Sequence, residues 1–231
     1  MFLKKVLKFI PAVLLLIILV LVAGCDDKNL IKKNMSDMRI NYFTGECDAF
    51  FVDLSCGYRE KEFAYDGVCS ENVECGVLGL VFKTTYSYSK IVVCLDVDGT
   101  LTEVTLERSP FENKYLADLE KIYNDQIIKV SLKNSGEIVS LKRSSDEFSV
   151  SYDKALNIGA NHFAKEFEDL YFNGKLNCEC YLKIINKKDF DKTYWYFSYI
   201  DRAQQSKAIL IDVLSGEVLA EKDWYKNIDF N

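Results

Sequence analysis

Proline and histidine are scarce in this chain of 231 residues, which has two prolines and one histidine. Little proline together with many tyrosine, phenylalanine, valine and isoleucine residues favours β-structure. A serine triad would have to use the lone His162, and no Gly-x-Ser-x-Gly sequence supplies its nucleophile. The Gly-x-x-x-x-Gly-Lys-Ser/Thr sequence that binds nucleotide phosphates is also missing. These absences argue against a serine hydrolase and a P-loop nucleotidase.

Positive charge is in short supply after the N-terminal segment 1–24. Without the three lysines of that segment, 26 basic residues stand against 35 acidic ones, a net charge of −9. This balance argues against binding nucleic acid or an anionic membrane surface. No later apolar run is long enough to span a bilayer.

The N-terminal segment 1–25 combines a basic start with an apolar run. Lys4, Lys5 and Lys8 precede an uncharged segment that ends in Val-Ala-Gly-Cys at Cys25. This ending resembles the lipobox of bacterial lipoproteins. The resemblance implies that 1–24 is a signal peptide, that Cys25 receives a diacylglycerol, and that the chain is anchored in the cell membrane, facing outside the cytoplasm. An uncleaved membrane anchor is the alternative.

Residues 25–36 are polar and show no periodicity, which predicts a tether between the lipid and the folded part. Apolar and polar residues then alternate in several short runs, which predicts strands. Residues 37–143 are therefore expected to form an antiparallel, sandwich-like β domain.

The strongest local signal is Asp98-Gly99, between the runs Ile91–Val97 and Thr100–Leu106. A two-residue hairpin turn of type I′ needs positive φ at both positions, which suits this pair. Three facing pairs are then expected: Val93 with Val104, Leu95 with Thr102, and Val97 with Thr100.

Residues 109–123 fit two structures. Ser109-Pro110 followed by Glu112 has the form of a helix start. The segment is short, however, and leads into a strand-like run at 127–132. Helix and strand both remain open for it.

The region 144–223 begins with apolar residues at helical spacing from Leu156 to Leu170, and strand-like runs follow. The order of one helix and a meander, ending in Ile211-Asp212-Val213-Leu214-Ser215-Gly216-Glu217, resembles the PepSY domain. The resemblance implies a small helix-plus-antiparallel-sheet domain that binds or inhibits and contributes no catalytic group. The whole chain is thus expected to be α+β, with 224–231 as a tail.

The segment Val92 to Thr102 contains Asp-Val-Asp-Gly-Thr after an apolar strand. It resembles the first motif of haloacid-dehalogenase-like phosphatases, which implies Asp96 as nucleophile, Asp98 as general acid and base, and a bound Mg²⁺. That family also needs a second acidic pair, usually after glycine, and the chain has no Gly-Asp. The alternation that continues beyond Gly99 favours a hairpin, so the phosphatase is kept as the alternative.

Seven cysteines follow Cys25, and their pairing cannot be chosen from the sequence. An oxidising location would allow three disulfides, whereas a reducing one would leave free thiols. Cys178-Glu179-Cys180 resembles half a metal site, but packing or a disulfide is preferred because no second pair accompanies it. The seven are Cys47, Cys56, Cys69, Cys75, Cys94, Cys178 and Cys180.

Alternating aromatic residues between Tyr194 and Tyr199 predict a strand with one face in the core. Its other face is either packed as well or a platform for a ligand. With the membrane address and the incomplete catalytic motifs, these features predict a non-catalytic protein that binds a peptide, a protein or a cell-wall component. No cofactor or metal is expected, apart from Mg²⁺ under the phosphatase alternative.

Overall fold

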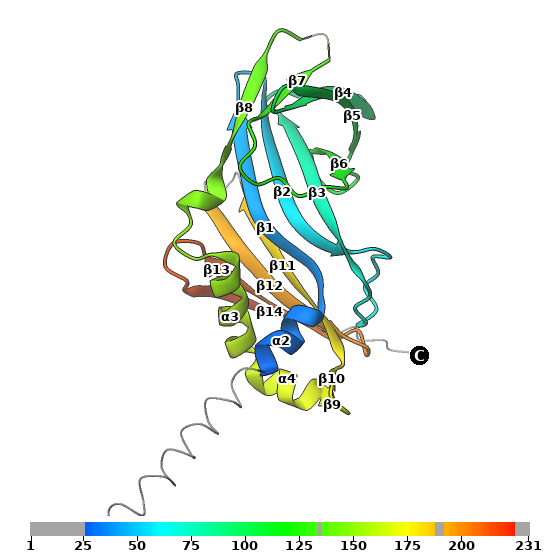
Figure 1. Ribbon diagram of the computed structural model, residues 1–231, viewed down its shortest axis with the longest axis vertical. Helices are drawn as coiled ribbons and strands as arrows, with labels where there is room; N and C mark the ends of the chain where they lie inside the picture. The colour runs from blue at the N-terminus through cyan, green and yellow to red at the C-terminus, as the bar shows by residue number, and fades with distance from the viewer. Residues whose placement is uncertain (1–25, 134, 188–191, 225–231) are drawn as a thin grey trace, which may run out of the picture.

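The computed structural model describes residues 26–133, 135–187 and 192–224, and most of its elements are strands (Figure 1). The predicted signal peptide, the lipidation residue Cys25 and residues 225–231 of the predicted tail lie outside the described residues. The strands of the first part are β1 (Met35–Glu46), β2 (Phe50–Glu60), β3 (Asn72–Phe82), β4 (Lys90–Val97), β5 (Thr100–Arg108), β6 (Tyr115–Leu119), β7 (Ile128–Leu132) and β8 (Ile138–Arg143). Those of the second part are β9 (Tyr171–Phe172), β10 (Lys175–Leu176), β11 (Cys178–Lys187), β12 (Lys192–Asp201), β13 (Ser206–Asp212) and β14 (Val218–Trp224). The helices are α2 (Asp26–Lys33), the 3₁₀ turn η1 (Ser144–Glu147), α3 (Tyr152–His162) and α4 (Ala164–Leu170).

The first eight strands close into an antiparallel barrel in the order β1-β2-β3-β6-β5-β4-β7-β8. The closing contact pairs Phe43 and Thr44 of β1 with Arg143 and Lys142 of β8. The predicted sandwich-like domain is therefore wrong. The alternation of apolar and polar residues shows only that one face of each strand is buried. A barrel and a sandwich produce the same alternation, so the long-range β1–β8 pairing is what distinguishes the two folds.

The strands β11 to β14 extend the same sheet away from the barrel. The start of β1 pairs in parallel with β11 through Met35, Asp37 and Met38, and its later residues pair with β8 on that edge. The expected α+β chain with a PepSY-like module is wrong, because its strands continue the barrel's sheet through β1. Figure 1 shows α2, α3 and α4 grouped beside this extension.

Two apolar cores lie on either side of this junction. The barrel core includes Phe43, Phe50 and Leu54, each at most 2% exposed. The second core lies between the helices and the extended sheet and includes Met35 and Trp195, each 1% exposed. Because β1 contributes Met35 to one core and Phe43 to the other, a single strand links both.

The predicted hairpin is confirmed. Asp98 and Gly99 have φ values of 51° and 86°, as a type I′ turn requires. The β4–β5 register also has the three facing pairs that the sequence predicts. Within 109–123 the regular element is the strand β6, because its Tyr115 fills the barrel core and its backbone pairs with β3.

The expected tether is ordered over much of its length. Asp26–Lys33 form α2, whose Ile31 is 5% exposed and packs in the second core. The Asn34 side chain donates to the carbonyls of Leu176 and Cys178, both at 2.8 Å. Two adjacent apolar residues, Leu30 and Ile31, in an otherwise polar segment are too weak a pattern to predict this docking. None of the helices in the described ranges has both the length and the apolarity needed to cross a membrane.

Candidate binding groove

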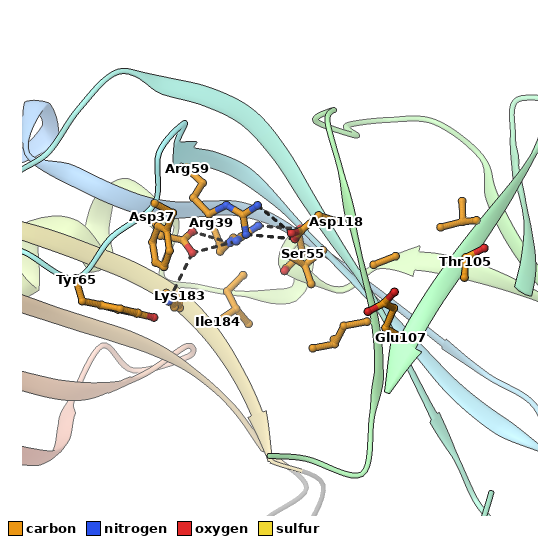
Figure 2. A pocket seen from close by; sticks show the side chains of 15 residues that line it. Asp37, Arg39, Ser55, Arg59, Tyr65, Thr105, Glu107, Asp118, Lys183 and Ile184 are labelled. Carbon is orange, nitrogen blue, oxygen red and sulfur yellow. Dashed lines mark hydrogen bonds and ion pairs between the residues drawn. The ribbon is translucent and has the colours of Figure 1, made fainter. Parts of the chain in front are cut away.

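A groove of about 690 Å³ lies where the extended sheet leaves the barrel. Its floor is the outer face of β1, β2, β3 and β6, and its walls come from β5, β11 and the loop after β2 (Figure 2). Charged and aromatic side chains dominate the lining. We call it the junction groove, and its charged and aromatic members are Asp37, Arg39, Arg59, Phe63, Tyr65, Glu107, Asp118 and Lys183.

A buried ion pair occupies the floor of the junction groove. Arg39 Nε lies 2.8 Å from Asp37 Oδ1, and the two side chains are 6% and 4% exposed. They point to the same side because they are two positions apart on β1. Lys183 Nζ approaches the other Asp37 oxygen at 3.6 Å from β11. The parallel β1–β11 pairing thus brings together charges that are far apart in the chain.

A second ion pair joins two barrel strands across the groove. Arg59 of β2 contacts both carboxylate oxygens of Asp118 on β6, at 3.2 and 3.1 Å. The Asp118 side chain is 62% exposed, so this pair faces solvent. The Arg59 side chain is only 26% exposed, so solvent reaches the pair mainly from the carboxylate side. Of the two arginines in the groove, Arg59 is therefore the more accessible to an incoming carboxylate, since Arg39 is only 6% exposed.

Three aromatic rings surround the ammonium group of Lys183. The centroids of Phe63, Tyr65 and Tyr181 lie 5.6, 6.0 and 5.1 Å from its Nζ. Cation–π attraction to such rings holds the ammonium in place. Phe63 and Tyr65 belong to the β2–β3 loop, and Tyr65 remains 55% exposed, so the loop offers an aromatic surface at the groove.

Two buried carboxylates hold this loop against the sheet. Glu60 accepts a hydrogen bond from Ser36 Oγ at 2.5 Å and another from the Ser70 amide. Glu179, which is fully buried, accepts from the Gly67 amide at 3.1 Å. Burial raises the pKa of Glu179, because the charged form loses its hydration there. The loop that carries the aromatic wall is thus anchored at two points.

The two aspartates of the phosphatase-like motif lie away from the junction groove and serve the hairpin turn. Asp96 Oδ1 accepts from the Gly99 amide, and Asp98 Oδ1 accepts from the Ile127 amide, both at 2.8 Å. The chain continues from this turn into β5, not into a helix. His162 lies on α3 and its Nε2 is 2.8 Å from Glu221 Oε2.

All seven described cysteines are free thiols. Cys178 and Cys180 are fully buried in the second core, as packing predicts. Burial raises the pKa of Cys56 and of Cys69 to about 11, which makes both thiols poor nucleophiles at neutral pH. Across the described ranges, no group of three or more histidine, cysteine and acidic residues is placed to hold a metal ion.

The aromatic strand β12 has one face in the core, as its alternation predicts. Trp195 and Phe197 are at most 1% exposed, whereas Tyr194 and Tyr196 line a second hollow of about 550 Å³ on the opposite face. That hollow is mostly apolar and lies on β11 to β14.

The residues of the junction groove were not singled out from the sequence. One signal was present, because the opposite charges of Asp37 and Arg39 occupy alternate positions of one strand and so share a face. Charges at such positions indicate either an ion pair or a site. When compared with protein families, with curated proteins and with solved structures, the chain matches none of them.

Proposed function

We propose that the protein is a lipid-anchored, extracytoplasmic binding protein that takes a peptide or protein segment in the junction groove. The observation that carries the proposal is the lining of this groove. Guanidinium, ammonium and carboxylate groups meet there beside an exposed tyrosine. Polypeptides carry both signs of charge together with apolar side chains, so they match such a lining better than a uniformly charged polymer does.

The groups of the junction groove are held in pairs and pack on regular strands. Arg39, Asp37 and Lys183 form one cluster, and Arg59 and Asp118 form another. A ligand carboxylate can replace Asp118 at Arg59, because it offers the same two-oxygen contact while the exposed Asp118 side chain returns to solvent. Groups that are already fixed lose little conformational entropy on binding, which favours a binding role.

The membrane address rests on the lipobox resemblance at Cys25. A diacylglyceryl group supplies two acyl chains, which is enough for stable anchoring. Cys25→Ala is expected to abolish incorporation of a palmitate analogue and to move the protein out of the membrane fraction. Palmitate incorporation that survives this change would contradict the proposed anchor.

Binding is tested by selection from a random library of twelve-residue peptides with the full-length protein in detergent micelles. The enriched peptides are then synthesised and titrated calorimetrically. Arg59→Ala is expected to weaken them roughly ten- to hundredfold, since a charge-assisted hydrogen bond contributes about 1.5–3 kcal/mol. The matched control is Lys142→Ala, which removes an exposed cation of β8 outside the groove. Equal binding by both variants, or no saturable binding by the wild type, would contradict the proposal.

A further inference from the structure

The barrel wall is incompletely paired between β5 and β6. β5 pairs with β4 along eight consecutive positions, from Thr100 to Glu107. Its pairing with β6 is restricted to Glu107 opposite Leu116 and Arg108 opposite Tyr115. Within the described ranges, the stretch Thr100–Leu106 therefore has no ladder partner on this side.

The backbone groups on this free edge can be assigned. Arg108 N donates to Ser89 O at 2.9 Å on the β4 side, and the Val92 carbonyl accepts from Lys133 N at 2.9 Å on the β7 side. In an antiparallel ladder, successive residues direct their N–H and C=O groups to opposite sides. Thr105, which faces Val92, thus points its backbone groups away from β4. Glu103 and Leu101 follow at steps of two and do the same.

This edge has few of the features by which proteins protect exposed strands. Natural edges are shortened, bent by bulges, interrupted by proline or given inward-pointing charges. The β4–β5 register has no bulge, β5 contains no proline, and its inward residues Val104 and Leu106 are apolar. At β14, the end strand of the sheet, the register with β13 shifts between Leu210 and Ile211. The edge of β5 is thus less protected than that of β14.

The free edge of β5 leads directly into the junction groove. Val104, Thr105 and Glu107 line the groove together with Leu116 and Ala117 of β6. Figure 2 shows Thr105 and Glu107 across the groove from Asp37 and Tyr65. A strand laid along β5 would enter the groove as it passes Thr105.

We propose that the partner is bound by strand addition: an extended, basic and apolar peptide segment pairs with Leu101, Glu103 and Thr105 of β5 and runs into the junction groove. This inference rests on the proposed function and specifies its binding mode and ligand class. Backbone hydrogen bonds supply the affinity in such complexes, and alternate side-chain sites supply the specificity.

The charged and apolar side chains of β5 indicate which residues the bound peptide segment needs. The outward side chains of Glu103 and Glu107 form ion pairs with the exposed lysines Lys133 and Lys90, and such exposed pairs exchange readily. Lysine or arginine on the outer face of the segment fits these carboxylates, as does the net charge of −9 that the chain carries after the segment 1–24. Its inner face meets Val104 and needs apolar residues.

The test uses an eight-residue synthetic peptide with valine at alternate positions and lysine or threonine between them. It is titrated against the full-length protein in detergent micelles, with two kinds of control. The first is N-methylated at every second amide, with one peptide for each of the two possible sets of amides. The second has glutamate in place of lysine. Both controls are expected to bind roughly tenfold more weakly or not at all, because one lacks backbone donors and the other repels Glu103.

Amide hydrogen exchange locates the peptide on the protein. The hydrogen exchange of the Leu101, Glu103 and Thr105 amides is expected to slow when the peptide binds. The exchange of the Thr102 and Val104 amides, which already bond to β4, is expected to change little. Side-chain binding alone would not produce this alternation. Thr105→Pro removes one outward donor without touching the β4 ladder and is expected to weaken peptide binding up to about tenfold. If that variant does not fold, Glu103→Lys replaces it, with a preference reversed toward the glutamate peptide.

The outcomes separate the binding mode from the function. Library peptides that bind Arg59→Ala more weakly but Thr105→Pro as well as the wild type, together with a valine-lysine peptide that N-methylation does not weaken, would overturn strand addition and leave the groove as a binding site. No binding of the valine-lysine peptide, while library peptides bind, would overturn the ligand class. Protection that appears without peptide and rises with protein concentration would identify a second copy of the chain as the occupant and overturn the proposal.

Discussion

At the scale of single residues, Asp37 and Arg39 form the most buried ion pair in the described part of the protein. Two charges that are at most 6% exposed have given up most of their hydration. Their mutual attraction and the contacts of Arg39 with Ser55 O and Cys75 Sγ, at 3.4 and 3.3 Å, offset that cost. Removing one partner therefore costs more than the pair contributes.

Asp37→Asn is expected to lower the free energy of unfolding by about 3–5 kcal/mol, because it leaves the Arg39 guanidinium buried without a counter-charge. Urea unfolding measures this change. Lys142→Ala, at an exposed pair, is expected to change stability by less than about 1 kcal/mol. The double variant Asp37→Leu with Arg39→Met should regain most of the loss. If it does not, the loss comes from packing and not from an unpaired charge.

Glu179 gives stability a dependence on pH. Burial raises its pKa above the ordinary value of 4.5, so the folded protein holds this proton more tightly than the unfolded chain does. Its stabilising contribution is complete below pH 4.5 and is lost as the pH rises through the raised pKa. Each unit of elevation corresponds to about 1.4 kcal/mol.

Glu179→Gln keeps an oxygen that can accept from the Gly67 amide and removes the ionisation. We expect the variant to be more stable than the wild type at pH 7 and the difference to shrink toward pH 4. Urea midpoints measured across this range check the sign. A variant that is less stable at pH 7 by the same amount as at pH 4 would show that the carboxylate contributes only through its hydrogen bond.

At the scale of elements, the β4–β5 hairpin depends on its turn. Gly99 has a φ of 86° and no atom within 4 Å of an added Cβ, so a substitution there changes only backbone strain. Gly99→Ala is expected to destabilise by roughly 1–2 kcal/mol, the cost of a left-handed conformation for an L-residue. Thermal unfolding measures it.

Gly136→Ala is the matched control for this turn, because its added Cβ also meets open space and its φ is not in the left-handed region. It should be neutral or slightly stabilising, since alanine restricts the unfolded chain. Equal losses at both glycines would show that the strain at Gly99 is not what the measurement reports.

Local elements could be predicted from the sequence, and their long-range assembly could not. The turn at Asp98-Gly99 and the register of β4 with β5 follow from residues that are close in the chain. The closing β1–β8 pair joins Phe43 to Arg143, and the parallel β1–β11 pair joins Met35 to Cys180. Alternation carries no information about either of these distant pairings. The junction groove is lined from both sides of the β1–β11 pair, so its residues could not be grouped in advance.

At the scale of the whole molecule, β1 makes the barrel and the extended sheet depend on each other. Its Met35 lies in the second core and its Phe43 in the barrel core. Trp195 reports on the second core, where it is 1% exposed and donates to the Val150 carbonyl at 2.8 Å. A substitution that destabilises the barrel should therefore also lower the stability of the second core around this tryptophan.

Phe50→Ala in the barrel core is expected to cost about 3–5 kcal/mol, because Phe50 is fully buried. In a Trp224→Phe background, Trp195 is the only tryptophan, and its fluorescence transition in urea should move together with the circular dichroism transition. Phe111→Ala, at a side chain that is 94% exposed, should move neither. A Trp195 transition that stays in place while the circular dichroism transition shifts would instead support two independent domains that divide near residue 143. Coincident shifts would mean that a ligand bound in the junction groove, which contacts strands of both parts, stabilises the entire chain and not one half of it.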